Sequence, residues 1–136
     1  MALNQTHPPD TMKHVFTAAR ILLGIIFLVF SANYWLKFIP IPSPAAESLA
    51  AGFMGAIYGS GFLTFVKVLE LLSAVLLLSG RYINLALTLL GPIVVNILLF
   101  HVMIKQSDHA LSVVIAVLAL VVLIGQKNYL KAIFAK

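Results

Sequence analysis

The sequence predicts an all-α membrane protein, a bundle of four transmembrane helices with a short interfacial or re-entrant helix between the first and second spans. Three observations support this fold class. Hydrophobic residues make up 62% of the chain and charged residues only 10%, against roughly 25% charged residues in an ordinary soluble domain. Four apolar segments approach or exceed the length that crosses a hydrocarbon core of about 30 Å. At 136 residues, the chain forms one domain.

The first span is predicted over residues 15–36, behind a polar N-terminal tail (residues 1–14) that is expected to be disordered. The alternative is a cleaved signal peptide. The apolar run is longer than the usual hydrophobic region of such a peptide, about 7–15 residues, and Lys37 closes it like a membrane anchor. The small residues Ala45 and Ala46 keep cleavage open as an alternative.

A short helix is predicted next, because Ser43 can cap a helix that has Pro44 at its first position. Gly52, Gly55 and Gly59 then gather on one face, with a Gly-x-x-x-Gly spacing from Gly55. Small residues let helices approach closely in a membrane. We therefore expect an interfacial or re-entrant helix that packs on its neighbours, with Gly55 and Gly59 as interface residues. A plain loop is the alternative.

Three further spans are predicted over residues 62–79, 83–104 and 110–125. The third span contains Pro92, which removes a backbone donor and is expected to kink the helix; membrane helices tolerate this where neighbours satisfy the freed carbonyl. Residues 126–136 form a basic, amphipathic tail suited to an anionic membrane surface.

The positions of Lys and Arg predict the orientation. One side of the membrane carries Lys37 and Lys105 outside the spans. The side with both termini carries Lys13, Arg20, Arg81, Lys127, Lys131 and Lys136. By the positive-inside rule, both termini face the cytoplasm.

A polar site is predicted inside the membrane. Lys67 and Glu70 lie three residues apart and so share a helix face, and charges in a bilayer usually face a bundle interior or an aqueous cavity. Glu70 and Asn96 have equal depth, about 12 Å below the outer boundary at 1.5 Å per residue. The sequence therefore predicts an outward-opening pocket, with these two residues at its floor and Lys67, His101 and Asn33 on its walls.

Arg20 approaches this pocket from below, and its side chain is long enough to extend towards Glu70. Each residue also has a simpler interpretation. Lys67 and Glu70 can form an ion pair that only fixes packing, Arg20 can extend to the headgroups, His101 can be interfacial, and Asn96 can join helices. On an ideal helix Asn96 and His101 are about 140° apart. Either a kink reorients the turn or one of them points elsewhere.

Other residues are expected to be structural. Trp35 and Lys37 are typical interfacial anchors. Arg81 belongs to the turn that ends the second span.

Two segments resemble the DoxX family of small four-helix membrane proteins. The first runs from Arg20 through Asn33-Tyr34-Trp35 to Pro40, and the second from Lys67 through Gly80-Arg81-Tyr82 to Phe100-His101. The resemblance implies a protein of the bacterial cytoplasmic membrane, tied to membrane redox chemistry. A similar subunit belongs to a thiosulfate:quinone oxidoreductase, and other relatives accompany oxidative-stress and quinone-resistance systems. The motif positions that carry over are Arg20, Glu70, Arg81, Asn96 and His101.

The leading functional hypothesis is binding of a quinone or similar small amphiphile in support of a redox partner protein. His101, Lys67 and Asn96 can donate hydrogen bonds to quinone carbonyls, and Glu70 can exchange protons. The alternatives are a small proton-coupled exporter centred on Glu70 and a non-catalytic scaffold or assembly factor, and a homo-oligomer fits any of the three.

The sequence also excludes several kinds of chemistry. The chain has no cysteine, which excludes disulfides and thiolate ligands. One intramembrane histidine cannot supply two haem ligands, and no clustered ligand set indicates a metal. The basic residues are scattered, which argues against nucleic acid. No complete catalytic centre is visible, so the chain is expected to be at most a membrane subunit of an oxidoreductase.

Overall fold

The computed structural model describes residues 9–136, and these residues form helices and no strand. The predicted all-α class is therefore confirmed. In chain order the elements are α1 (Asp10–Leu36), α2 (Leu49–Gly59), α3 (Phe62–Ser79), α4 (Ile83–Leu99), a π-helical segment η1 (Phe100–Lys105), α5 (His109–Gly125) and α6 (Lys127–Ile133).

Three of these helices are long and apolar enough to cross a membrane: α1, α3, and α4 continued by η1. A fourth crossing is formed only if α5 and α6, which meet at an angle of 90°, count as one broken span. The 17 residues of α5 alone extend about 25 Å at 1.5 Å per residue. These apolar helices indicate a multi-pass membrane protein.

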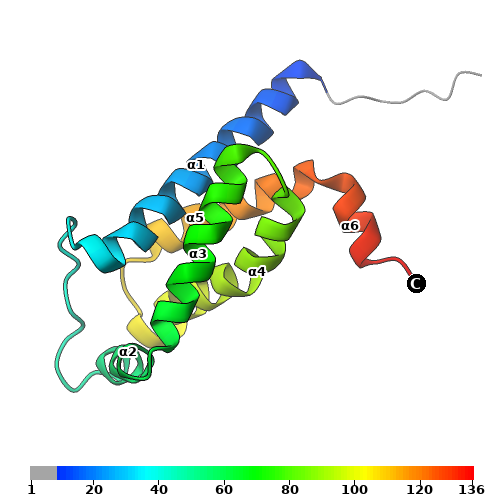
Figure 1. Ribbon diagram of the computed structural model, residues 1–136. Helices are drawn as coiled ribbons and strands as arrows, with labels where there is room; N and C mark the ends of the chain where they lie inside the picture. The colour runs from blue at the N-terminus through cyan, green and yellow to red at the C-terminus, as the bar shows by residue number, and fades with distance from the viewer. Residues whose placement is uncertain (1–8) are drawn as a thin grey trace, which may run out of the picture.

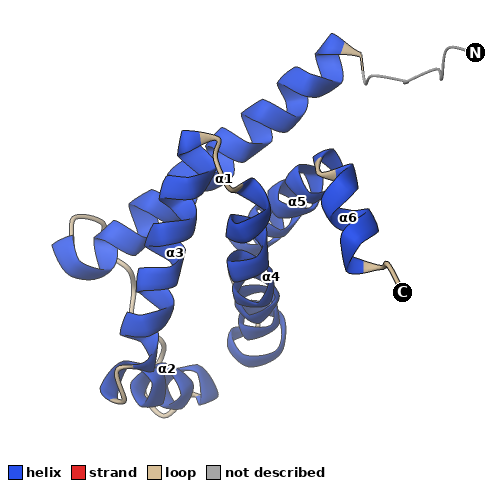
Figure 2. Ribbon diagram, turned by 45° about the vertical axis from the view of Figure 1, so that its right-hand side comes forward, coloured by secondary structure: helices blue, strands red, loops and turns tan. Residues whose placement is uncertain are grey.

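The long helices pack around one apolar core (Figure 1). α1 packs against α3 and α5, and α4 packs against the same two helices. The most deeply buried apolar side chains of this core are Leu23, Phe27, Ala74, Leu77, Ala86, Leu90 and Val122. Figure 2 shows α2 lying across one end of the long helices and α6 at the other. We call these the α2 end and the α6 end.

The first helix begins earlier than the sequence predicts. α1 starts at Asp10, so the expectation of a disordered tail is wrong for residues 10–14. Asp10 lies in the first turn, where a negative charge interacts favourably with the helix dipole, and the Met12 N–H donates to the Pro9 carbonyl at 2.8 Å. The remainder of the predicted tail, residues 1–8, lies outside the described residues.

The short helix begins later than predicted, at Leu49 rather than Pro44. Ser48 is the N-cap, and its hydroxyl accepts a hydrogen bond from the Ala51 N–H at 3.1 Å. The residue before a proline is disfavoured in helical conformation, which keeps the segment around Pro44 in a loop. A β-carbon added at Gly52, Gly55 or Gly59 would meet no atom within 4 Å. The predicted close packing of this glycine face within the chain is therefore wrong.

The close packing of α1 on α3 depends on Gly24. A β-carbon there would lie 2.9 Å from both Cγ and Cδ2 of Leu78, so the close approach of α1 to α3 requires a residue without a side chain. We expect Gly24→Ala to lower the free energy of unfolding by about 1–3 kcal/mol, because the extra methyl group overpacks this contact.

The matched control is Gly52→Ala in α2, where an added β-carbon has no neighbour within 4 Å. This change should be neutral or stabilising by up to about 1 kcal/mol, because alanine favours the helix. Chemical unfolding in detergent measures both variants. Equal stabilities for the two would contradict the predicted packing role of Gly24.

Candidate functional site

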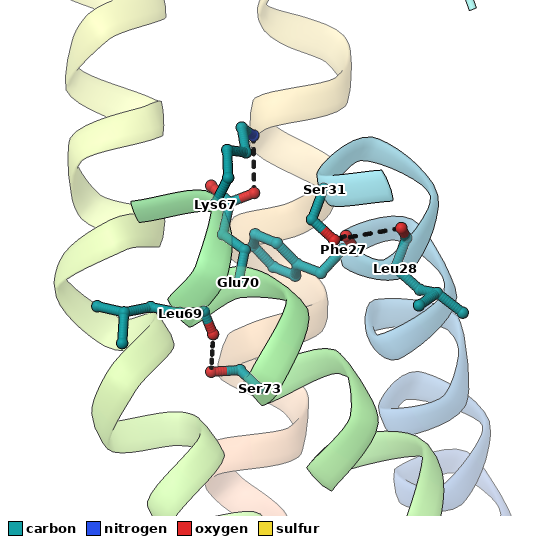
Figure 3. Close-up of polar contacts among 7 residues, drawn as sticks. All are labelled: Phe27, Leu28, Ser31, Lys67, Leu69, Glu70 and Ser73. Atoms are coloured by element: carbon teal, nitrogen blue, oxygen red, sulfur yellow. Dashed lines mark hydrogen bonds and ion pairs between the residues drawn. The ribbon is translucent and has the colours of Figure 1, made fainter. Parts of the chain in front are cut away.

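The centre of the candidate site is an ion pair on α3 (Figure 3). Lys67 Nζ lies 2.7 Å from Glu70 Oε2, and the two residues are three apart on the helix, as the sequence predicts. The Glu70 side chain is only 4% exposed and the Lys67 side chain 19% exposed. Among the described residues Glu70 is the one acidic side chain that is buried. The pair therefore places a carboxylate inside the apolar core with its cation nearer to the surface.

Two buried serines lie near the pair, one on α1 and one on α3. Ser31 Oγ donates to the Phe27 carbonyl at 2.5 Å, and Ser73 Oγ donates to the Leu69 carbonyl at 2.8 Å. Figure 3 shows Phe27 and Ser31 on α1, next to the helix that carries the ion pair. Both hydroxyl protons are used within their own helices, so the charged pair carries the chemistry that is open to a ligand.

Part of this pair is free to bind. Within the described chain no hydrogen bond reaches Glu70 Oε1, and no fully enclosed side-chain nitrogen or oxygen there lacks a hydrogen-bond partner. Oε1 therefore keeps some accessible surface. Lys67 has three N–H donors and uses one of them on Oε2. The pair can thus accept a hydrogen bond at Oε1 and donate one from Lys67, which suits a ligand with hydroxyl or carbonyl groups.

Arg20 does not extend to Glu70, and the prediction that it does is wrong. Its Nη1 donates to the Leu77 carbonyl in the last turn of α3, and the guanidinium lies against Gly80 in the turn that follows. The C-terminal end of a helix presents free carbonyls and partial negative charge. A cation therefore finds its nearest partner there rather than at a carboxylate deeper in the core.

Asn33 is buried, but it does not line a pocket. Its Nδ2 donates to the Ile39 carbonyl at 3.0 Å, and its Oδ1 accepts from the Ile39 N–H at 2.6 Å. Its own carbonyl accepts from the Lys37 N–H at 2.9 Å. The side chain therefore holds the loop that leaves α1. The expectation that Asn33 forms a wall of the ligand site is wrong, because both polar atoms of its side chain are engaged by the backbone.

Asn96 does not form the floor of a pocket with Glu70. It is exposed, and its Nδ2 donates to the Pro92 carbonyl of its own helix at 2.8 Å. The two residues have the same predicted depth, but Asn96 lies on the outer face of α4. α4 continues through Pro92, and His101 lies in the π-helical segment that follows. Asn96 is exposed whereas His101 is half-buried, so Asn96 is the one that points away from the core.

His101 lies half-buried in η1, where Nδ1 bonds to the Ile97 carbonyl at 2.8 Å. Its ring packs edge-to-face on Phe100, with centroids 5.4 Å apart, and Phe100 packs on Phe53 of α2 at the same centroid distance. π-helical turns occur frequently at functional sites. Here the segment links α4 to α2, and no hydrogen bond joins His101 to the ion pair in the described chain.

The anchor residues after α1 form an aromatic cluster at the α2 end. Lys37, with φ of 55°, ends α1, and its ammonium lies 5.1 Å from the ring centroid of Tyr34 and 5.7 Å from that of Tyr58. The Tyr34 hydroxyl lies 2.6 Å from Thr64 Oγ1. Trp35 packs edge-to-face on Tyr34 at 5.1 Å. The sequence indicated Trp35 and Lys37 as anchors but not Tyr58 and Thr64, which join the ends of three helices.

A groove of about 280 Å³ lies at the α2 end, and sequence reasoning missed it. Two loops and the start of α2 form it. Its lining includes Ser43, Ser48, Ser107, Lys105 and Asp108. The hydrogen bond and charge of Lys105, 2.8 Å away, lower the pKa of the exposed Asp108 carboxyl, and His101 and His109 add smaller effects of the same sign. The polar loop composition was the available signal, but it did not show that the loops meet.

The described residues contain no group of three histidine, aspartate or glutamate side chains that could hold a metal ion. Arg81 is exposed in the turn between α3 and α4. The candidate site is therefore the Lys67–Glu70 pair with Ser31 and Ser73 nearby.

Comparison of the chain with models of known protein families, with curated proteins and with solved structures finds no match in any of the three.

Proposed function

We propose that the chain binds a small amphiphile with a quinone-like head at the Lys67–Glu70 pair and that it does so in support of a membrane redox partner. The observation that carries this proposal is the buried ion pair, in which only one carboxylate oxygen of Glu70 is bonded to Lys67. Charges within a membrane protein are costly and mark functional sites by default. The sequence resemblance to the DoxX family supports the redox context.

The proposed membrane arrangement has four spans, α1, α3, α4 with η1, and α5, and α2 lies in the interface. The apolar character of the 17 residues of α5 supports the fourth span. The excess of lysine and arginine at the α6 end supports placing both termini in the cytoplasm. The family resemblance supports the bacterial cytoplasmic membrane as the location.

The chemistry of the pair matches both redox forms of a quinone. A quinone carbonyl accepts a hydrogen bond from the Lys67 ammonium, whereas a quinol hydroxyl donates one to Glu70 Oε1. Leu69, which is partly buried next to Glu70 on α3, supplies apolar surface for a ring. In this proposal Arg20, Asn33 and Asn96 hold the fold rather than the ligand, since their polar groups bond to backbone carbonyls. Electrons come from the partner protein.

Two other functions remain as alternatives. The open glycine face of α2 favours a scaffold or assembly role, because Gly52, Gly55 and Gly59 leave room for a partner helix or a second copy. The single buried acid, Glu70, is the feature that favours a proton-coupled exporter.

The test is mass spectrometry of small molecules that co-purify with the protein in mild detergent, followed by titration with a short-chain ubiquinone analogue. We expect Glu70→Gln to weaken retention at least about tenfold, because it removes a charged acceptor and leaves Lys67 without its partner. Glu47→Gln is the matched control, since Glu47 is exposed in the loop before α2. It should bind like the wild type.

A wild-type protein that retains no amphiphile and does not bind the analogue would refute the binding proposal. The same molecules retained by all three proteins would refute the assignment to Glu70. In either case the scaffold alternative is tested next, by capture of a partner with the wild type and with Gly55→Leu. Proton-driven transport by vesicles, lost in Glu70→Gln, would instead identify an exporter.

A further inference from the structure

The last helix turns sharply out of the helix core. α5 ends at Gly125, and α6 runs at 90° to it. A β-carbon at Gly125 would lie 2.9 Å from Cγ of Phe16 in α1, so a residue without a side chain allows the close contact at this bend. α6 therefore does not continue the axis of α5 but turns back towards the start of α4. Figures 1 and 2 both show α6 leaving the end of α5 in this way.

Tyr129 fixes α6 against α4. The Tyr129 hydroxyl lies 2.5 Å from Thr88 Oγ1, and the Thr88 hydroxyl donates its one proton to the Asn84 carbonyl at 2.8 Å. Tyr129 is therefore the donor in the contact with Thr88. Tyr129 and Leu130 are half-buried against the core. This contact sets which face of α6 is turned outwards.

The outward residues of α6 and the segment after it combine apolar and basic side chains. Ile133 is 53% exposed and Phe134 is 80% exposed. Lys127 and Lys131, four residues apart and so on the same side of the helix, are both exposed. Lys136 is exposed as well, and no aspartate or glutamate follows Asp108 in the chain. Exposed lysines together with exposed aromatic and aliphatic side chains are suited to a membrane interface.

Charge at this end of the molecule is one-sided. α1 starts, α3 ends and α4 starts at the α6 end, so Lys13 and Arg81 lie there too, and both are exposed. Asp10 is the acidic residue described at this end. Lysines and arginines near a surface attract anionic lipids.

We infer that α6 and the segment that follows it form a recognition surface for anionic phospholipid headgroups. Ile133 and Phe134 enter the boundary of the hydrocarbon region, while Lys127, Lys131 and Lys136 bind headgroup phosphates in the same leaflet. The Tyr129–Thr88 contact connects this surface to α4. The occupant is a lipid rather than a protein, because the basic residues are accompanied by large exposed apolar side chains at the end of a bundle of apolar helices. The inference is independent of the ligand at Lys67 and Glu70.

The experiment uses a fluorescent probe at the surface itself. Phe134→Trp in a Trp35→Phe background leaves one tryptophan, since the chain contains a single one. The purified protein in non-ionic detergent is titrated with phosphatidylglycerol or with phosphatidylcholine, and the emission maximum is followed. We expect a blue shift at a lower concentration of phosphatidylglycerol than of phosphatidylcholine. Lys127→Gln and Lys131→Gln should each raise the phosphatidylglycerol midpoint about fivefold, and high salt should do the same.

Lys105→Gln, at the opposite end of the molecule, is the control and should leave the midpoint unchanged. Equal midpoints for the two lipids would overturn the inference, as would lysine variants that titrate like the control. Native mass spectrometry of the wild type, which needs no probe, gives a second reading. Preferential retention of phosphatidylglycerol that is reduced in the Lys127→Gln/Lys131→Gln variant supports the surface, and equal retention of both lipids by the wild type overturns it.

Discussion

Lys67→Met is expected to lower the free energy of unfolding by about 3–5 kcal/mol at neutral pH, the cost of breaking a buried ion pair by removing one partner. The reason is the position of Glu70, whose side chain is 4% exposed and whose Oε2 is bonded to Lys67 Nζ. Without the ammonium, the carboxylate has no cation within the core. Chemical unfolding in detergent, followed by circular dichroism, measures the loss.

The double variant Lys67→Met/Glu70→Met should recover most of this stability, because apolar side chains of similar size often replace a buried ion pair at little cost. The stability losses of Lys67→Met alone and Glu70→Met alone are therefore expected to sum to much more than the loss of the double variant. Losses that add would show that each residue is stabilised by other groups. The double variant also separates structure from function, since it should fold like the wild type and still fail to retain a quinone-like ligand.

The helices could be predicted from the sequence because long apolar runs and their stop signals are local. α3 covers the residues of the predicted second span, and Gly80, with φ of 70°, ends it. The start of α2 could not be predicted as well, since Ser43 and Ser48 are both plausible caps by composition. The choice between them depends on backbone conformation: Ser48 adopts the extended geometry of a cap, after Glu47 in a left-handed one.

The ion pair could be predicted and the rest of the pocket could not, for one physical reason. Spacing within a helix determines whether two side chains share a face, and this was sufficient for Lys67 and Glu70. Matching depths between helices gives the level of a residue along the membrane normal but not its direction around the helix. Glu70 and Asn96 were assigned the same level, yet Glu70 faces the core and Asn96 faces outwards.

Polar side chains also bind the nearest free backbone group, which a sequence pattern does not reveal. Asn33 donates a hydrogen bond to the Ile39 carbonyl in the loop after α1, and Arg20 donates one to a carbonyl at the end of α3. The groove at the α2 end depends on two loops more than fifty residues apart, around Ser43 and Ser107. The sequence shows that these residues are polar, but nothing in it indicates that the two loops lie close together in the fold.

Arg20→Met is expected to cost about 1.5–3 kcal/mol of stability, the usual contribution of a hydrogen bond to a charged group. Arg20 donates to the Leu77 carbonyl, which also accepts from the Gly80 N–H at 3.3 Å, so it ties α1 to the turn between α3 and α4. Arg81→Met is the matched control, because Arg81 is exposed in that same turn. It should change stability by no more than about 0.5 kcal/mol.

Ligand retention decides between this structural role and a direct role of Arg20 at the ligand. If Arg20 only caps α3, Arg20→Met should bind the ubiquinone analogue with wild-type affinity at temperatures where it stays folded, and Arg20→Lys should recover part of the lost stability by keeping the charge near the helix C-terminus. Loss of binding at unchanged stability would contradict the capping role and place the guanidinium at the ligand. The fold argues for the first result, because the Leu77 carbonyl lies seven residues beyond Glu70 on α3, which is about 10 Å along the helix axis.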